Sequence, residues 1–308
     1  MSVFRQIAGL FCGWSAVWLT GCGKEQLARQ MVDHSRFPGT LRLLLAGPPR
    51  RLIERGRITA HRRVPAPDGT ELDLWLIAGD TATRGKPRGT VLLLHGMWDS
   101  KARMLAPGRL LADRGFDVVL PDLRGLGRSG GAHTTFGVLE VDDLRAAMAA
   151  VRDDGFAAPP FYVVGFSMGG GIAIQYAARE PRCAGVLALA PAAGARQAMR
   201  HALRFLAPAM GRRDADAVID RAAEIAGVDI DLASAVEAAP RLRCPLIVAQ
   251  GAWDVIVPPS HGRAVFAAAP QPKRLVSIPL TGHLTLLPGR AAWIADRIDE
   301  LAAAPAQK

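Results

Sequence analysis

From residue 90 onward, short apolar runs alternate with longer stretches in which apolar residues recur at helical spacing. Unbroken apolar runs are typical of strands that are buried on both faces. Their alternation with helices is typical of a parallel sheet covered on both sides. We predict strands at 90–94, 117–120, 161–164, 186–190, 246–249 and 274–279, and helices at 101–114, 138–152, 168–179, 260–269 and 290–301.

Two further β-type runs, at 58–64 and 71–77, precede this pattern. The turn-forming sequence Pro67-Asp68-Gly69 lies between them, so we expect an antiparallel pair. With it, the sheet has about eight strands.

Residues 192–242 interrupt the alternation with helix-forming sequence, which we predict to be a lid. Arg196, Arg200 and Arg204 share one helical face because they are four residues apart. A solvated face is the ordinary interpretation of these arginines, and contact with a headgroup or a carboxylate is the alternative.

The first 22 residues have the pattern of a targeting segment. Arg5 is followed by an apolar stretch at 7–19 and then by Leu19-Thr20-Gly21-Cys22. Thirteen helical residues span only about 20 Å, against roughly 30 Å for a bilayer core, so a signal peptide is favoured over a spanning helix. The ending resembles the bacterial lipobox, which implies cleavage before Cys22 and lipidation of its sulfur. An ordinary signal peptide or an uncleaved amphipathic terminus is the alternative.

Length and composition favour one large globular domain, since the 308 residues are half apolar and contain no long polar or repetitive tract. The net charge of +10 suits an anionic surface, although an arginine-rich composition style also explains it. No Lys/Arg run, zinc-ligand spacing or aromatic RNA motif supports nucleic-acid binding. The predicted division is a signal peptide at 1–21, a lipid-anchored tether at 22–56, a core in two parts at 57–191 and 243–308, and the lid between them.

Two of the four cysteines are candidates for each other. Cys183 and Cys244 each precede an apolar run, so neighbouring parallel strands would place both thiols at the same end of the sheet. Two buried free thiols are the favoured state, and a disulfide is the alternative in a compartment outside the cytosol.

The sequence Gly165-Phe166-Ser167-Met168-Gly169 directly follows a predicted strand and opens a predicted helix. A serine on so sharp a turn adopts a strained backbone, and small neighbours are needed where strand and helix approach each other. The turn exposes the hydroxyl at a helix N-terminus, where developing negative charge is stabilised. Ser167 is therefore the candidate nucleophile.

With this turn, several separated pieces resemble the α/β-hydrolase superfamily from residue 57 to the end. The resemblance implies an α/β-hydrolase fold with a short helical lid, as in the monoglyceride-lipase-like and depalmitoylase-like esterases. The remaining pieces each follow a predicted strand, and they are His95-Gly96, Asp122 to Ser129 (D-x-R-G-x-G-x-S), Gly251 to Asp254, and Gly282-His283.

The resemblance assigns the general base to His283, on the loop after the last strand, and the orienting acid to Asp254. His95 competes for the role of base, but its place beside the oxyanion loop favours a structural role. Asp122 competes for the role of acid, but in its glycine-rich setting it usually fixes a loop. His133, His201 and His261 have no comparable context and are interpreted as ordinary polar residues.

The oxyanion donors are expected to be the backbone N–H groups of Met168 and, by resemblance, Met97. Together with Trp98, these residues would surround the nucleophile with apolar bulk, which favours an acyl chain, although plain packing explains them too.

These residues predict a serine hydrolase that cleaves small or lipid-like carboxylic esters or thioesters through an acyl-enzyme on Ser167, with no metal and no cofactor. Expected partners are the ester substrate and, through the N-terminal lipid, a membrane of the bacterial cell envelope; no obligate protein partner is evident. The alternatives are a cofactor-free perhydrolase or acyltransferase, a serine aminopeptidase, and a lipid-anchored binding module without catalysis.

Overall fold

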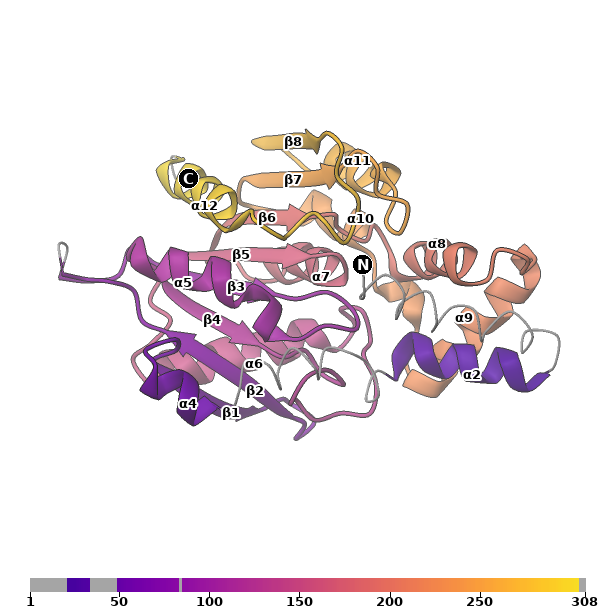
Figure 1. Ribbon diagram of the computed structural model, residues 1–308, viewed down its shortest axis with the longest axis horizontal. Helices are drawn as coiled ribbons and strands as arrows, with labels where there is room; N and C mark the ends of the chain where they lie inside the picture. The colour runs from indigo at the N-terminus through magenta and orange to yellow at the C-terminus, as the bar shows by residue number, and fades with distance from the viewer. Residues whose placement is uncertain (1–20, 34–48, 83–84, 305–308) are drawn as a thin grey trace.

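A twisted sheet of eight strands forms the centre of the protein (Figure 1). The computed structural model describes residues 21–33, 49–82 and 85–304. The strand order is β1-β2-β4-β3-β5-β6-β7-β8; β2 runs antiparallel to both β1 and β4, and β3 to β8 run parallel. This confirms the predicted fold class. The strands are β1 (Ala60–Pro65), β2 (Glu71–Ile77), β3 (Thr90–Leu94), β4 (Asp117–Pro121), β5 (Phe161–Phe166), β6 (Cys183–Leu189), β7 (Leu246–Gly251) and β8 (Lys273–Ile278).

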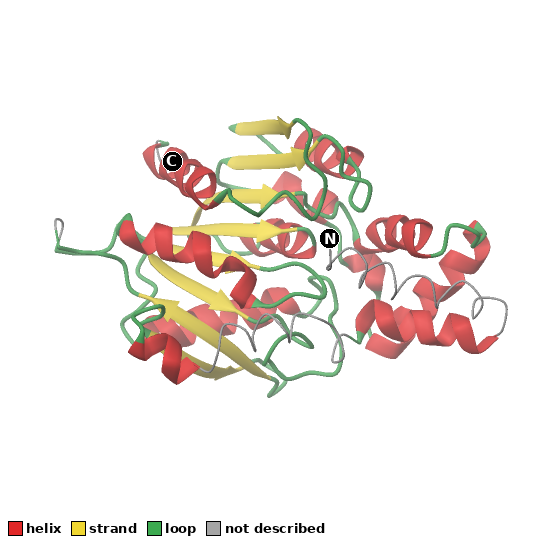
Figure 2. Cartoon of the chain, viewed as in Figure 1, coloured by secondary structure: helices red, strands yellow, loops and turns green. Residues whose placement is uncertain are grey.

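Helices cover both faces of the sheet, as Figure 2 shows. The strands β3, β4, β5 and β7 are buried along their whole length, because apolar side chains leave both of their faces and each face needs a cover. The helices α5 (Leu105–Asp113) and α12 (Ala291–Ala303) close one core. The helices α6 (Glu140–Asp153), α7 (Met168–Ala177) and α11 (Pro259–Ala268) close the other.

The insertion after β6 forms a helical layer beyond the carboxyl ends of the strands (Figure 1). Its long helices are α8 (Ala195–Leu206) and α9 (Arg212–Ala226), and its short ones are η3 (Ile230–Leu232), α10 (Ala235–Ala238) and η4 (Ala239–Arg241). Two of the three arginines on α8 bind carboxylates of the insertion itself: Arg196 pairs with Asp220 and Asp231, and Arg200 with Asp216.

The helix α2 (Gly21–Val32), from the segment predicted to be a tether, packs on α9 (Figure 1). One of its faces is fully buried, through the side chains of Leu27, Ala28, Met31 and Val32. Ion pairs from Lys24 to Asp214 and from Glu25 to Arg221 cross the same interface. The sequence interpretation did not foresee this packing. Because α2 packs on α9, it forms part of the helical layer of the lid together with α8 and α9.

The end of α2 also contacts the main body near the site described below. The carbonyl of Val32 accepts a hydrogen bond from the N–H of Thr134 at 3.0 Å, and that of Gln30 accepts one from the indole N–H of Trp98 at 3.5 Å. A second short helix, α4 (Pro49–Glu54), contacts β1. No helix in the described ranges is long and apolar enough to cross a membrane, and residues 1–20 of the predicted signal peptide lie outside those ranges.

The two strand-end cysteines face each other unbridged. The sulfur atoms of Cys183 and Cys244 are 3.7 Å apart, and both side chains are buried. The facing thiol of Cys244, and then burial, raise the pKa of Cys183, so it is held as a neutral thiol.

Candidate active site

Ser167 occupies the sharp turn between β5 and α7, with φ 58° and ψ −118°. Backbone at this φ is strained for any residue with a Cβ atom. The flanking glycines make the turn possible: a Cβ on Gly165 would lie 2.0 Å from the carbonyl oxygen of Gly169, and a Cβ on Gly169 would lie 2.4 Å from that of His95. The turn therefore forms only with this local sequence, and it holds Ser167 at the start of a helix.

Three side chains from distant parts of the chain meet at this turn. The Nε2 atom of His283 lies 2.9 Å from the hydroxyl oxygen of Ser167, and its Nδ1 atom lies 2.7 Å from Oδ2 of Asp254. A carboxylate only accepts hydrogen bonds, so Nδ1 carries the proton and Nε2 offers its lone pair to the serine O–H. This tautomer is the one that a base for serine requires.

Asp254 is itself held from several directions in a buried position. Its Oδ1 atom accepts the backbone N–H groups of Ile256 at 3.0 Å and Val257 at 2.8 Å, while the side-chain amide of Gln250 reaches Oδ2 at 3.3 Å. These donors from a tight loop fix the direction of the carboxylate. The imidazole of His283 packs against the ring of Phe166 with centroids 4.9 Å apart, which fixes the plane of the base.

The loop after β3 lies directly against the nucleophile. A Cβ on Gly96 would lie 3.3 Å from the Cβ of Ser167, so the next residue, Met97, comes beside the serine. Met168 follows Ser167 as the first residue of α7, where a helix leaves its N–H groups without helical acceptors. The side chain of Met168 is buried, and those of Met97 and Trp98 are partly buried in the adjoining core. The two predicted oxyanion donors thus come from neighbouring segments.

The structure places the competing residues in other roles. His95 is fully buried; its Nδ1 faces the carbonyl of Gly96 at 2.8 Å, and its Nε2 accepts the N–H of Leu123 at 3.1 Å. Burial lowers its pKa, and both ring nitrogens are occupied by backbone, so it cannot serve as the base. Asp122 accepts the backbone N–H groups of Lys101 at 2.7 Å and Arg128 at 2.8 Å, and so fixes the loop.

A buried ion cluster behind the oxyanion loop was not anticipated from the sequence. The ammonium group of Lys101, which is fully buried, binds the carboxylates of Asp73 and Asp122 and lies 5.0 Å from the ring centroid of Trp75. Burial alone would raise the pKa of Asp73, but Lys101 holds it below its ordinary value. The cluster ties β2, the segment after β3 and the loop after β4 together.

A histidine pair corrects the interpretation of His201 and His261 as ordinary polar residues. Nδ1 of His261 accepts the backbone N–H of Ala193 at 3.1 Å, so its proton lies on Nε2, which faces Nδ1 of His201 at 2.7 Å. His261 is fully buried, and the pair links α8 of the lid to α11 of the core. Burial, and then His201, lower the pKa of His261 to about 4. His133 is partly exposed, and its position agrees with the ordinary interpretation.

Within the described residues, no group of three or more His, Cys, Asp or Glu side chains is placed to hold a metal ion.

Comparison with known proteins finds similarity to hydrolases. A family model described as "Serine aminopeptidase, S33" (Hydrolase_4) matches residues 85–227. The chain is 26% identical over 220 residues to the Escherichia coli K12 "Uncharacterized protein YfhR", covering 71% of both proteins. It is 29% identical over 208 residues to the monoacylglycerol lipase of Mycolicibacterium smegmatis, covering 58% of this chain and 74% of that enzyme.

Solved structures agree on the fold. The Pyrococcus furiosus esterase Pf2001 superposes with a TM-score of 0.64 at 19% identity, covering 81% of this chain and 92% of that one. The protein has the α/β-hydrolase fold, as predicted from the sequence.

Proposed function

We propose that the protein is a serine hydrolase that cleaves carboxylic esters or thioesters of small or lipid-like acyl groups. The observation that carries this proposal is the continuous hydrogen-bonded series from the hydroxyl of Ser167 through His283 to Asp254. Such a series converts a weak nucleophile into an active one, because the imidazole takes the proton as the serine oxygen attacks. Similarity to a monoacylglycerol lipase and to esterases supports an ester as the substrate.

The reaction runs in two halves. In the first, the oxygen of Ser167 attacks the carbonyl carbon while Nε2 of His283 accepts the serine proton. The imidazolium then gives this proton to the departing alcohol or thiol, which leaves the acyl group on Ser167. In the second half, His283 takes a proton from water, the hydroxide attacks the acyl-enzyme, and the acid leaves as the proton returns to Ser167. Asp254 stabilises the imidazolium in both halves.

Negative charge develops on the carbonyl oxygen at each attack, and the backbone N–H groups of Met97 and Met168 would receive it. Both come from short segments fixed by buried contacts, so they need little rearrangement during the reaction. The side chains of Met97 and Trp98 are partly buried against the adjoining core, and beside the nucleophile they would offer apolar surface, which suits an acyl chain better than a charged peptide.

Replacement of the nucleophile tests this function. We expect Ser167→Ala to lose hydrolysis of short p-nitrophenyl esters by roughly 10⁶-fold, the scale seen when serine hydrolases lose their nucleophile. A fluorophosphonate probe should label the parent chain and not the variant. Ser260→Ala is the matched control, because this exposed serine on α11 lies outside the site. Retained turnover or labelling in Ser167→Ala would contradict the assignment.

An aminopeptidase activity is the second candidate, because the matching family model carries that description. A free amine needs an available carboxylate near the nucleophile, but Asp254 is committed to His283, and Asp99 pairs with Arg103. We therefore expect aminoacyl p-nitroanilides to turn over at least about a hundredfold more slowly than short esters. That factor is an order-of-magnitude expectation for a missing polar contact. Peracid formation with added peroxide distinguishes the perhydrolase alternative.

Location at a bacterial membrane is part of the proposal. The sequence Leu19-Thr20-Gly21-Cys22 supports lipidation of Cys22, which lies in the first turn of α2. A mobility shift or metabolic fatty-acid labelling that is lost in Cys22→Ser tests it. An unlabelled parent chain would leave an ordinary signal peptide or an uncleaved amphipathic terminus as the explanation.

A further inference from the structure

Large apolar side chains are exposed beside the two residues that serve Ser167. Trp253 and Val255 flank Asp254, and Leu280 and Leu284 lie close to His283 in sequence. Their exposed fractions are 64%, 65%, 73% and 62%, so none of the four is packed in a core. Exposed apolar side chains are ordinary when scattered, but a group of them next to a functional site indicates a binding surface.

The two loops that carry these side chains are joined to each other. The N–H of Trp253 donates to the carbonyl of Thr281 at 3.0 Å, and that of Ala252 donates to the carbonyl of Ile278 at 2.9 Å. Leu280 has φ 52°, a left-handed conformation that is strained for a side chain of its kind. The backbone thus holds a large apolar residue out of the core at a conformational cost. We call Trp253, Val255, Leu280 and Leu284 the apolar rim.

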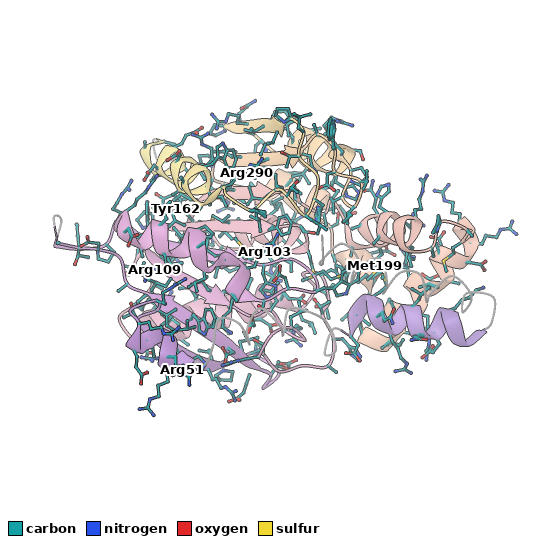
Figure 3. All side chains as sticks on the ribbon, in the orientation of Figure 1. Arg51, Arg103, Arg109, Tyr162, Met199 and Arg290 are labelled. Atoms are coloured by element: carbon teal, nitrogen blue, oxygen red, sulfur yellow. The ribbon has the colours of Figure 1, made fainter. Side chains whose placement is uncertain are left out.

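Basic groups lie next to the apolar rim, although one of them, Arg103, which donates to the carbonyl of Leu284 at 3.5 Å, is paired with Asp99. Residues 255–295 include both Leu280 and Leu284 and contain no aspartate or glutamate. Arg290, labelled in Figure 3, donates to the hydroxyl of Thr281 at 3.0 Å, directly beside the rim. Among the described residues, Arg290 forms no ion pair with a carboxylate. The adjacent Asp254 is buried and engaged with His283, so it offers no charge to the surface.

We propose that the apolar rim docks on an anionic lipid bilayer, so that the site opens onto the lipid surface from which its substrate is drawn. Apolar side chains insert into the boundary between headgroups and acyl chains, while nearby cations are attracted to the anionic headgroups. A protein partner would more commonly match such a cation with acidic and polar groups. The proposal extends the proposed function, but the docking step does not depend on hydrolysis.

Vesicle binding tests the docking surface. The chain used begins at residue 22 with Cys22→Ser, which omits the apolar stretch at 7–19 and carries no lipid; it is sedimented with vesicles of phosphatidylglycerol and phosphatidylcholine or of phosphatidylcholine alone. The rim variant is Trp253→Gln/Leu280→Asn/Leu284→Gln on this background, since asparagine tolerates the left-handed backbone at 280. Leu232→Gln is the matched control, because Leu232 is 66% exposed on η3 of the lid.

We expect the rim variant to partition onto anionic vesicles at least about tenfold more weakly than its parent, by the loss of apolar burial. The control should bind like the parent, and raising the salt concentration should weaken both. Unchanged binding by the rim variant overturns the proposal. Equal binding to vesicles of phosphatidylcholine alone would also overturn the proposal. Self-association that depends on the rim, measured by size-exclusion chromatography, would overturn it too. Hydrolysis of a soluble ester separates the two proposals, and its rate should agree within about twofold among the three chains. Docking that depends on the rim but is accompanied by no hydrolysis would refute only the proposed esterase activity.

Discussion

Acidification should destabilise the protein through His261, the buried histidine that links the core to the lid. Its Nδ1 atom already accepts the N–H of Ala193, and its Nε2–H already faces Nδ1 of His201. A proton added to either histidine would therefore bring two N–H groups face to face, and the arrangement offers no second tautomer that avoids this. Arg204 adds to the lowering of the pKa of His201, after burial, whereas Asp254 partly opposes the lowering for His261.

The size of this effect follows from the pKa of His261, which falls from the ordinary 6.5 to about 4 in the folded protein. The unfolded chain binds the proton first as the pH falls. The contribution of neutral His261 to the free energy of unfolding is therefore fully present above about pH 6.5, and it is lost progressively as the pH falls toward 4. The loss is about 2 kcal/mol near pH 5 and about 3 kcal/mol once both states are protonated.

Urea unfolding of the parent and His261→Gln between about pH 5 and pH 8 measures this loss. The glutamine oxygen can still accept from Ala193 but does not titrate in this range. The drop in the free energy of unfolding from pH 8 to pH 5 should therefore be about 2 kcal/mol smaller in the variant than in the parent. His133→Gln, at a partly exposed histidine, should keep the parent's pH dependence. Identical pH profiles for the parent and His261→Gln would refute the reasoning.

Three further changes test other parts of the structure. Lys101→Met removes the buried cation that two buried carboxylates share, so the free energy of unfolding should fall by about 3–5 kcal/mol in urea titrations; an unchanged midpoint would contradict the cluster. Met31→Ala opens a cavity between α2 and the lid, and a loss of about 2–4 kcal/mol is expected in the same assay; no loss would mean that α2 is not packed as described. Asp254→Asn keeps the shape of the site but favours the wrong tautomer of His283, so kcat for a short ester should fall by roughly 10⁴-fold; a loss below tenfold would assign the acid elsewhere.

The sequence predicts the sheet from its apolar runs, and the resemblance then indicates Ser167, Asp254 and His283, each of which lies just beyond a predicted strand. Parallel strands end at one edge, so residues that follow strands far apart in the chain come together there. The glycines around Ser167 are a local requirement of the turn and can be recognised without any tertiary contact. The ends of the strands are harder to predict from the pattern. For example, β6 begins at Cys183, before the predicted residue 186, because Cys183 and Gly185 pair with β5.

The features that the sequence could not predict depend on contacts between segments that share no local pattern. Lys101 reads as an ordinary polar residue at the start of a helix, and only the fold brings Asp73 to it across 28 positions. His201 and His261 meet because the lid returns to the core, which helical periodicity does not specify. For α2, the signal-like sequence before it and the prolines after it favoured a tether, although its apolar residues at 27, 28, 31 and 32 have helical spacing.

The packing of α2 also limits how an acylated chain could be oriented. Its ion pair to α9 begins at Lys24, two positions past Cys22, and the helix reaches Trp98 after a rise of only about 12 Å. An acyl group on Cys22 would therefore have almost no slack between itself and the folded body. The molecule would then be held at the bilayer with a restricted tilt, close to the headgroups. It would not move freely in the surrounding water, as it would on a long flexible linker.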